Sequence, residues 1–487
     1  MQTFVFKGFW AGTETEDFIG AAFLEPFPGF GGNAYVVGSK VSGTMSVFRL
    51  SEDGLPELVL EMDQLAAEDG YVSGGIAFEQ NGDAIWAWDS LTGQVLSFDG
   101  PEDQAESTLT TQGGQVLTFS IIEPVEGGYV IAPAERDEIL LLHDDAGGLS
   151  IEDRVTDDAK SNVMDLSDLL AIDVGGRDFL ISASHSESGL TCFELQDGQL
   201  IQRDHIGAKD GLWANGVTRL AECTVNGEQY VIALSSGANS LHSLRINENG
   251  VFFTADSIWD SRDTRFEGAR DMDLFTWQGR DFLVVGGQDA GLSLIEILPG
   301  GEFVHHQSIP QSADWDIGPV SEIEVHLIGP QAQIMVTGSQ GAGVAHLTLD
   351  LDDVGVRIEG TAGNDTLRGD ALGNVVIGGA GNDRLRGLEG EDILLAGTGS
   401  DALSGEEGAD VFVFIGDGQH DKITDFQMGL DRIDLSGWGR LYDYEELTIT
   451  QAGFATRITW RDEQLDVYSY DGLPIAIEDW GAEDFIF

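Results

Sequence analysis

The sequence predicts an all-β chain built from two internal repeats, one about fifty residues long and the other nine residues long. Residues before about 355 form short β-branched and aromatic runs between Gly, Asp, Asn and Ser turns, without a long stretch of helical periodicity. A glycine- and aspartate-rich stretch follows, from Gly360 to Val413, and it consists of nine-residue units. The remaining residues, to Phe487, are mixed, with strands expected at 447–450 and 455–460.

The longer repeat is clearest in an apolar strand that recurs along the first part of the chain. Its seven copies start 44 to 52 residues apart, at Tyr35, Ile85, Tyr129, Phe179, Tyr230, Phe282 and Ile334. A propeller blade is a four-stranded sheet of roughly 40–50 residues. The repeat therefore predicts a seven-bladed β-propeller over residues 1–355, similar to the broad class that includes lactonase-like and WD-repeat-like propellers.

The N-terminal run is expected to close the ring of blades. The seventh copy leaves little chain for a fourth strand before Gly355, whereas the run from Thr3 to Trp10 is strand-like and precedes the first copy. We expect this run to pair as the outer strand of the last blade. A frayed N-terminal tail is the alternative.

The shorter repeat comprises six consecutive nine-residue units without an insertion. The sixth position of each unit is acidic or an amide: Asp365, Asn374, Asp383, Asp392, Asp401 and Asp410. The eighth position is apolar: Leu367, Val376, Leu385, Leu394, Leu403 and Phe412. The alternative is a flexible linker, but a linker has no reason to repeat an apolar residue at every ninth position.

This pattern resembles the RTX family of secreted calcium-binding proteins. The resemblance implies a parallel β-roll in which two nonapeptides complete one turn, so that loops two units apart stack. Calcium takes six to eight oxygen ligands at about 2.3–2.6 Å, which two stacked loops can supply and one cannot. The resemblance then implies ions between Asp365 and Asp383 and between Asp383 and Asp401 on one edge.

On the other edge, the resemblance implies ions between Asp392 and Asp410 and between Asn374 and Asp392. The site of Asn374 is expected to be the weakest, because Asn374 carries no charge and Leu372 stands where a glycine is expected.

The segment after the nonapeptides, 417–436, resembles the cap of the roll in serralysin-type proteases, although the chain lacks their His-Glu-x-x-His zinc motif. We place the roll at 356–436, and the cap with an export signal at 437–487. The expected metal-binding residues are Gly363, Asp365, Asn374, Gly381, Asp383, Gly390, Asp392, Gly399, Asp401, Gly408, Asp410, Asp421, Asp425 and Asp431.

The charge of the chain fits calcium and argues against other partners. With 85 acidic and 24 basic residues, the net charge is -61. Nucleic-acid binding is disfavoured because phosphate contacts need Lys and Arg, and an anionic membrane surface would repel the chain. Divalent cations would relieve the repulsion between carboxylates. No segment has the apolar length of a membrane-spanning helix.

The resemblance also implies a route out of the cell. The N-terminus shows no cleavable signal peptide. RTX-like proteins typically leave Gram-negative bacteria through a type I ABC exporter that reads an uncleaved C-terminal signal. The acidic residues before a short apolar terminus, Glu483 to Phe487, look like such a signal. The resemblance thus implies a secreted, extracellular protein.

The two cysteines, Cys192 and Cys223, are too few for a disulfide framework. We expect two buried free thiols, and the alternative is a single bridge.

Three propeller loops that lead into inner strands combine tryptophan with acidic or amide groups, around Trp213, Trp259 and Trp315. Aromatic faces beside oxygen acceptors suit sugar rings, so we expect the propeller to bind an extracellular glycan or another partner. A blander alternative is that the tryptophans pack between blades and the acids stay solvated.

The rival function is a secreted hydrolase, lactonase-like or phosphoesterase-like, with a metal in the propeller channel that activates water. Its candidate catalytic residues are Asp271, Glu322 and Asn215. The chain contains no Gly-x-Ser-x-Gly, Walker or Rossmann motif, so the sequence leaves open whether the protein is an enzyme.

Overall fold

The computed structural model describes most of the chain and divides it into two compact units. The larger is built from Thr3–Thr276 and Asp281–Leu349, and the smaller chiefly from Asp350–Phe487. The description covers the strands of residues 4–108 and the residues 110–486 apart from 113, 135, 146–147, 159–160, 162, 262–263, 290, 340–342, 440 and 442. Within these residues there is no α-helix, and there are four short 3-10 helices: η2 (Ala208–Asp210), η3 (Tyr444–Glu446), η4 (Ile477–Asp479) and η5 (Ala482–Asp484).

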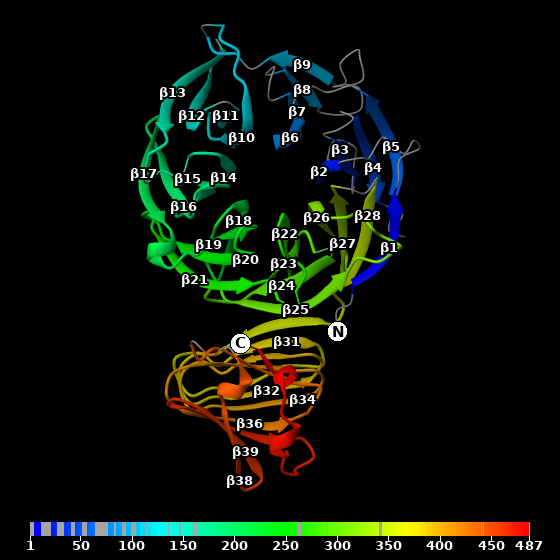
Figure 1. The fold of residues 1–487 in the computed structure, drawn as a ribbon, viewed down its shortest axis with the longest axis vertical. Coiled ribbons are helices and arrows are strands. Elements are labelled where there is room, and N and C mark those ends of the chain that lie inside the picture. Colours follow the sequence, from blue (N-terminus) through cyan, green and yellow to red (C-terminus); the bar gives the residue numbers. More distant parts are fainter. Residues whose placement is uncertain are drawn as a thin grey trace. The chain divides into compact units, whose positions relative to one another are not determined.

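The larger unit contains seven four-stranded antiparallel sheets arranged as the blades of a propeller (Figure 1). The first three blades are β2 (Ala21–Pro26), β3 (Ala34–Ser39), β4 (Thr44–Leu50) and β5 (Pro56–Asp63); β6 (Ile76–Asn81), β7 (Ala84–Asp89), β8 (Gln94–Phe98) and β9 (Gln104–Thr108); and β10 (Phe119–Val125), β11 (Gly128–Pro133), β12 (Glu138–Asp145) and β13 (Gly148–Thr156). The next three are β14 (Leu166–Asp173), β15 (Asp178–Ser184), β16 (Leu190–Gln196) and β17 (Gln199–Ile206); β18 (Val217–Val225), β19 (Glu228–Ser235), β20 (Ser240–Ile246) and β21 (Phe252–Trp259); and β22 (Asp271–Trp277), β23 (Arg280–Gly286), β24 (Gly291–Ile297) and β25 (Phe303–Pro310).

The seventh blade joins the two ends of the propeller sequence. It consists of β26 (Val320–Ile328), β27 (Gln331–Gly338), β28 (Val344–Asp350) and β1 (Phe4–Trp10). β1 pairs antiparallel with β28, from Phe4 opposite Leu349 to Trp10 opposite Val344. The predicted seven-bladed propeller and its closure by the N-terminal strand are confirmed.

Each apolar repeat forms the second strand of its blade, next to an innermost strand that faces the channel (Figure 1). Apolar faces of neighbouring blades pack against each other: Phe179 and Ile181 of β15 share a fully buried cluster with Val231 of β19. Cys192 and Cys223 are both buried and free, as expected from the sequence.

The smaller unit is a parallel β-roll of two sheets. One sheet has the order β29 (Val354–Glu359), β31 (Gly373–Ile377), β33 (Ile393–Leu395), β35 (Val411–Ile415), β37 (Arg432–Gly437) and β41 (Phe485–Ile486). The other has the order β30 (Thr366–Arg368), β32 (Arg384–Glu389), β34 (Ala402–Glu407), β36 (His420–Phe426), β40 (Glu463–Ser469), β39 (Ala455–Trp460) and β38 (Thr448–Ala452).

The register of the roll confirms that two nonapeptides make one turn. Leu367 pairs with Leu385 and Leu385 with Leu403, each eighteen residues on. The eighth-position residues from Val376 to Phe412 are buried in one apolar core, against which the partly buried Leu367 packs. This core forms because residues of a strand alternate between its two faces, so that one side chain in each short strand points inward.

The chain after the nonapeptides completes the roll. β38 and β39 lie where strands were expected, and β40 and β41 each extend one sheet of the roll. Trp480 stacks on Phe426, with ring centroids 5.3 Å apart, and also lies against Phe485. The final residues therefore share the apolar core of the roll.

Candidate metal centres and the propeller channel

The sixth-position residues of the nonapeptides form two ladders on opposite edges of the roll. On the first edge, the backbone amide of Asp365 donates to Oδ1 of Asp383 (2.7 Å), that of Asp383 to Asp401 (2.7 Å) and that of Asp401 to Asp421 (2.9 Å). These residues connect strands of the first sheet to strands of the second. The structure thus stacks the residues that the nonapeptide register placed together.

The second edge repeats the arrangement with the intervening units. The amide of Asn374 donates to Oδ1 of Asp392 (2.8 Å), that of Asp392 to Asp410 (2.9 Å) and that of Asp410 to Asp431 (3.1 Å). Asp421 and Asp431, which come from the capping segment, therefore continue the two ladders.

Four carboxylates in these ladders keep one oxygen buried without a partner. Within the described residues, Oδ2 of Asp383, Asp392, Asp401 and Asp410 accepts no hydrogen bond, and each residue is at most 2% exposed. A buried carboxylate oxygen without a partner is costly, and hard oxygens of this kind are the ligands that calcium prefers.

Glycine allows the backbone to approach two of these oxygens closely. A Cβ on Gly387 would lie 2.1 Å from Oδ2 of Asp392, and a Cβ on Gly405 would lie 1.9 Å from Oδ2 of Asp410. The buried and unpartnered carboxylate oxygens fit a cation such as calcium.

The fourth-position glycines hold the turns close together. Gly381, Gly390, Gly399 and Gly408 have left-handed φ angles between 109° and 149°. A Cβ on Gly399 would lie 1.7 Å from the carbonyl oxygen of Gly381, and one on Gly381 would lie 2.7 Å from that of Gly363. No side chain fits at these positions, because backbone carbonyls of successive turns are stacked there.

Burial disfavours the charged form of the laddered carboxylates. It raises the pKa of Asp410 to about 8, of Asp392 to about 7 and of Asp401 to about 6, with repulsion from neighbouring carboxylates adding to the effect. Burial likewise raises the pKa of Asp421 to about 7 and that of Asp431 to about 6. A bound divalent cation would oppose these shifts, since it favours the ionised form.

Three of the expected metal ligands have every side-chain oxygen engaged by the protein itself, among them Asp431, which accepts from the amides of Asp410 (3.1 Å) and Gln427 (2.8 Å). Asp425 accepts from the amides of Gly405 and Glu406, both at 3.1 Å. The side-chain oxygen of Asn374 accepts from the amide of Asp370 at 2.7 Å. Asp417, which the sequence analysis did not single out, accepts from the amide of Gly399 at 2.6 Å; it follows the last nonapeptide and so carries no register signal.

Side chains alone do not complete a metal site in the part of the chain that is described. No three His, Cys, Asp or Glu residues there gather closely enough to hold a metal ion. Ions in the roll would therefore draw on backbone carbonyls as well as carboxylates, which is common for calcium.

The three tryptophans of the propeller loops differ in exposure. Trp213, between β17 and β18, is 64% exposed, and Trp259, at the end of β21, is 51% exposed. Trp315, between β25 and β26, is only 2% exposed. A ligand can therefore reach Trp213 and Trp259, whereas the ring of Trp315 packs in the interior.

Asp271 and Glu322 meet in the channel around one arginine. Arg219 lies 3.3 Å from Asp271 and 3.8 Å from Glu322. Asp271 also accepts from the amide of Ile323 at 2.6 Å. Asn215 has other partners, since its carbonyl accepts from the hydroxyl of Ser235. The structure thus brings two of the three candidate catalytic residues together, through a guanidinium that sequence reasoning missed.

Carboxylates on the innermost strands link neighbouring blades at three junctions of the described residues. Glu123 accepts from the amide of Ala171 (2.8 Å), Asp168 from that of Leu220 (2.6 Å) and Asp273 from that of Val325 (2.7 Å). Burial raises the pKa of Glu123 to about 8 and that of Asp168 to about 6. These residues could have been identified in the sequence by their spacing. Each acceptor precedes its donor by 48 to 52 residues, which is close to the length of the blade repeat.

Outer strands carry a second set of such links. Asp153 accepts from the amide of Leu200 (2.7 Å), Asp204 from that of Phe252 (2.8 Å) and Asp256 from that of Phe303 (2.8 Å). The third and fourth blades, and the fourth and fifth, are therefore joined both on their innermost and on their outermost strands.

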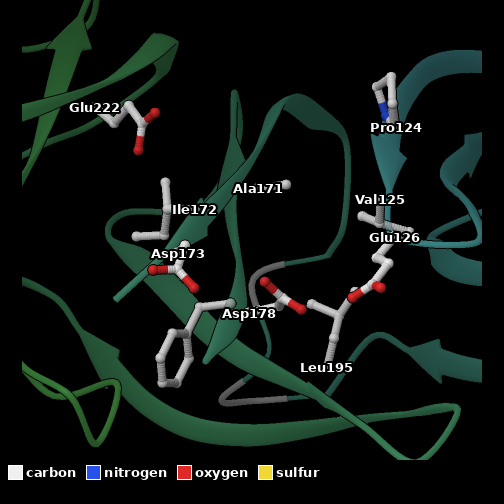
Figure 2. Close-up of a pocket in the computed structure, with 10 residues that line it drawn as sticks. Pro124, Val125, Glu126, Ala171, Ile172, Asp173, Asp178, Leu195 and Glu222 are labelled. Carbon is white, nitrogen blue, oxygen red and sulfur yellow. The ribbon is translucent and has the colours of Figure 1, made fainter. Parts of the chain in front are cut away.

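A pocket of about 300 Å³ opens between the third and fourth blades (Figure 2). Its apolar floor includes Ile172 and Leu195, and its carboxylates are Glu126, Asp173, Asp178 and Glu222. The pocket lies by the turns that leave the innermost strands, on the face opposite the loops of Trp213 and Trp259. It is separate from the tryptophan loops.

Fold and site together define an all-β protein in which a seven-bladed propeller precedes a parallel β-roll of RTX calcium-binding repeats. Residues 357–371 and 377–412 match the RTX calcium-binding nonapeptide repeat, in four copies. A search of the curated proteins finds no match. Among the residues described, no helix is long and apolar enough to cross a membrane.

Several solved structures are distantly similar to the chain. A proposed 6-phosphogluconolactonase from Bacteroides fragilis is 15% identical, with a TM-score of 0.44, over 62% of this chain and 86% of that one. Streptogramin B lyase is 11% identical, with a TM-score of 0.47, over 71% of this chain and 98% of that one. A subunit of a mannuronan C5-epimerase from Azotobacter vinelandii is 27% identical, with a TM-score of 0.22, over 26% of this chain and 80% of that one.

Proposed function

We propose that the protein is a secreted, calcium-dependent binding protein. In this proposal the roll at 356–436 takes up calcium outside the cell, and the propeller at 1–355 binds an extracellular or cell-surface ligand such as a glycan. The observation that carries the calcium part is the set of four buried Oδ2 atoms without a partner among the described residues, on Asp383, Asp392, Asp401 and Asp410, in stacked glycine turns.

Calcium would couple folding of the roll to secretion. Extracellular sites often bind calcium at about 10⁻⁴–10⁻³ M, so they stay empty in the cytosol, where calcium is scarce. Without an ion, the stacked carboxylates repel each other and the roll remains unfolded. Outside the cell, the free energy of calcium binding becomes free energy of folding.

The C-terminus supports export before folding. Residues 437–487 are proposed to hold a signal for a type I exporter, and Phe485 in β41 is only 3% exposed once the roll has formed. An exporter would therefore have to read the segment while the roll is unfolded.

The glycan part of the proposal rests on Trp213 and Trp259. Both are exposed indoles, one between β17 and β18 and the other at the end of β21, and such rings stack on the apolar faces of sugars. Asp210, in the loop of Trp213, is an exposed carboxylate that could accept hydrogen bonds from sugar hydroxyls.

Glycan-array binding by the calcium-loaded chain tests this part. Trp213→Ala and Trp259→Ala are expected to lose retention on the array. Phe253→Ala is the matched control, because Phe253 is an exposed aromatic on β21 outside these loops. If all three variants bind like the parent chain, the tryptophan surface is not the binding site.

The alternative is a metal-dependent hydrolase, lactonase-like or phosphoesterase-like, with Asp271, Glu322 and Asn215 in the channel. The guanidinium of Arg219 already pairs with Asp271 and Glu322, so a metal ion would have to compete with it for these carboxylates, which favours the binding function. Ester or lactone hydrolysis by the full chain, abolished by Asp271→Asn, would favour the hydrolase instead.

A further inference from the structure

The two edges of the roll differ at the second position of the last four nonapeptides. On the first edge, Gly379 and Gly397 occupy this position with left-handed φ angles of 92° and 86°. On the second edge, Leu388 and Glu406 occupy it with φ angles of 99° and 72°. The same left-handed turn is thus made by glycines on one edge and by residues with a β-carbon on the other.

A β-carbon makes this turn costly. In the left-handed region Cβ approaches the following carbonyl oxygen, so only glycine adopts it freely. On the first edge there is also no room for Cβ, since one on Gly397 would lie 1.9 Å from the carbonyl oxygen of Gly379. The turns of the second edge are therefore strained. They accommodate side chains at the position where, on the first edge, the backbone of one turn lies against the backbone of the next.

The start of each ladder adds to the difference. The first edge begins with the carboxylate of Asp365, whereas the second begins with the amide of Asn374, whose oxygen accepts from Asp370. Leu372 occupies the fourth position of the unit that contains Asn374. In later units this position is held by glycines with left-handed φ angles, such as Gly381 and Gly390. The second edge thus lacks a carboxylate at the sixth position of its first unit, and the one carboxylate of that unit, Asp370, stands at the second position instead.

The extra carboxylate of Glu406 does not offset this loss. It forms an ion pair with Arg386, whose Nε donates to Oε1 at 2.8 Å. Glu406 is therefore directed to a neighbouring cation of the protein, and the strain in its backbone brings no additional ligand to the turn.

We propose that the two edges bind calcium with unequal affinity: the edge of Asp383 and Asp401 fills first, and the edge of Asp392 and Asp410 fills last. Leu388 and Glu406 lower the affinity of the second edge because each ion there must stabilise a turn that is strained. The inference rests on the proposed calcium binding by the roll and adds an order to it. Rising calcium would complete the roll in two stages.

Calorimetric calcium titration of the full chain tests the order. The parent chain is expected to show two classes of sites. Asp383→Asn should remove the tighter class, and Asp392→Asn should leave its midpoint unchanged within about twofold, a difference of about 0.4 kcal/mol. The thermal transition of the propeller shows that each variant is folded.

Glu406→Gly and Glu406→Ala separate backbone strain from charge. Both remove the carboxylate and its ion pair with Arg386, but only glycine removes the β-carbon. Glu406→Gly should tighten the weaker class about fivefold, as expected when a left-handed residue with a β-carbon is relieved, and Glu406→Ala should leave it within about twofold.

Three results would overturn this inference: a single class of sites in the parent chain, loss of the tighter class in Asp392→Asn, or equal tightening by Glu406→Gly and Glu406→Ala. Each of them leaves calcium binding itself intact. A parent chain that takes up no calcium would overturn the proposed function as well, so the two failures are distinguishable.

Discussion

The backbone amide of Asp392 donates a 2.9 Å hydrogen bond to Oδ1 of Asp410, one turn of the roll further on. This bond engages one oxygen of Asp410, while Oδ2 stays buried without a partner among the described residues. The carboxylate is thereby held in place by the turn before it and left with one oxygen for a cation. Each rung of the ladder orients the next.

The close stacking of the turns predicts that Gly408→Ala abolishes calcium-induced folding of the roll. Its new Cβ would lie 1.6 Å from the carbonyl oxygen of Gly390, so the turns would have to separate. Gly429→Ala is the matched control, since Gly429 also has a positive φ but nothing lies within 4 Å of its Cβ. The control should lose only about 1–2 kcal/mol, from backbone strain. Circular dichroism at saturating calcium compares the two, and equal behaviour would refute close stacking.

The links between outer strands predict that Asp204→Ala destabilises the propeller. The change removes the acceptor of the Phe252 amide, and a hydrogen bond to a charged group contributes about 1.5–3 kcal/mol. Asp204→Asn keeps an acceptor oxygen and should lose less. The propeller transition in scanning calorimetry measures both variants, and an unchanged transition in Asp204→Ala would show that the link does not stabilise the fold.

The raised pKa of Glu123 predicts that the stability of the propeller depends on pH. Burial raises the pKa of its carboxyl from 4.5 to about 8, so the ionised form is disfavoured in the folded protein. Its contribution to stability is therefore fully present below pH 4.5 and is lost as the pH rises through about 8.

The variant Glu123→Gln removes this titration while keeping an oxygen for the amide of Ala171. Relative to the parent chain, it should gain about 1–3 kcal/mol at pH 9 and almost nothing at about pH 4. Thermal unfolding at the two pH values measures the difference. A gain that is equal at both pH values would rule out the raised pKa as its cause.

Substitution by alanine is expected to affect the stability of the propeller strongly at Trp315 and only slightly at Trp213. Trp315→Ala should cost about 3–5 kcal/mol of propeller stability, because the ring is buried and a cavity remains. Trp213→Ala should change stability by less than about 0.5 kcal/mol, since the ring is exposed. Chemical denaturation compares them, and similar losses would contradict their assigned environments.

Much of the fold was predictable because both repeats are periodic. An apolar residue at every eighth position of a nonapeptide, such as Leu385 and Leu403, is specified by the need to fill one core. The apolar strands around Phe179 and Tyr230 likewise mark blades, because β15 and β19 are buried on both faces.

Contacts between distant side chains were not predictable in the same way. Trp213 and Trp315 occupy similar loops in the sequence, and only packing makes one exposed and the other buried. Arg219 carries no motif, and its place between Asp271 and Glu322 depends on the curvature of the ring. The strain at Leu388 was hidden because the nonapeptide pattern fixes its sixth and eighth positions and leaves the second variable.

The measurement that tests the account most directly is a calcium titration of the full chain, followed by far-ultraviolet circular dichroism. Strand signal from the roll should be missing in EGTA, should rise as calcium reaches about 10⁻⁴–10⁻³ M, and should be lost again when the ion is chelated. A strand signal that is already complete in EGTA and unchanged by calcium would contradict the account.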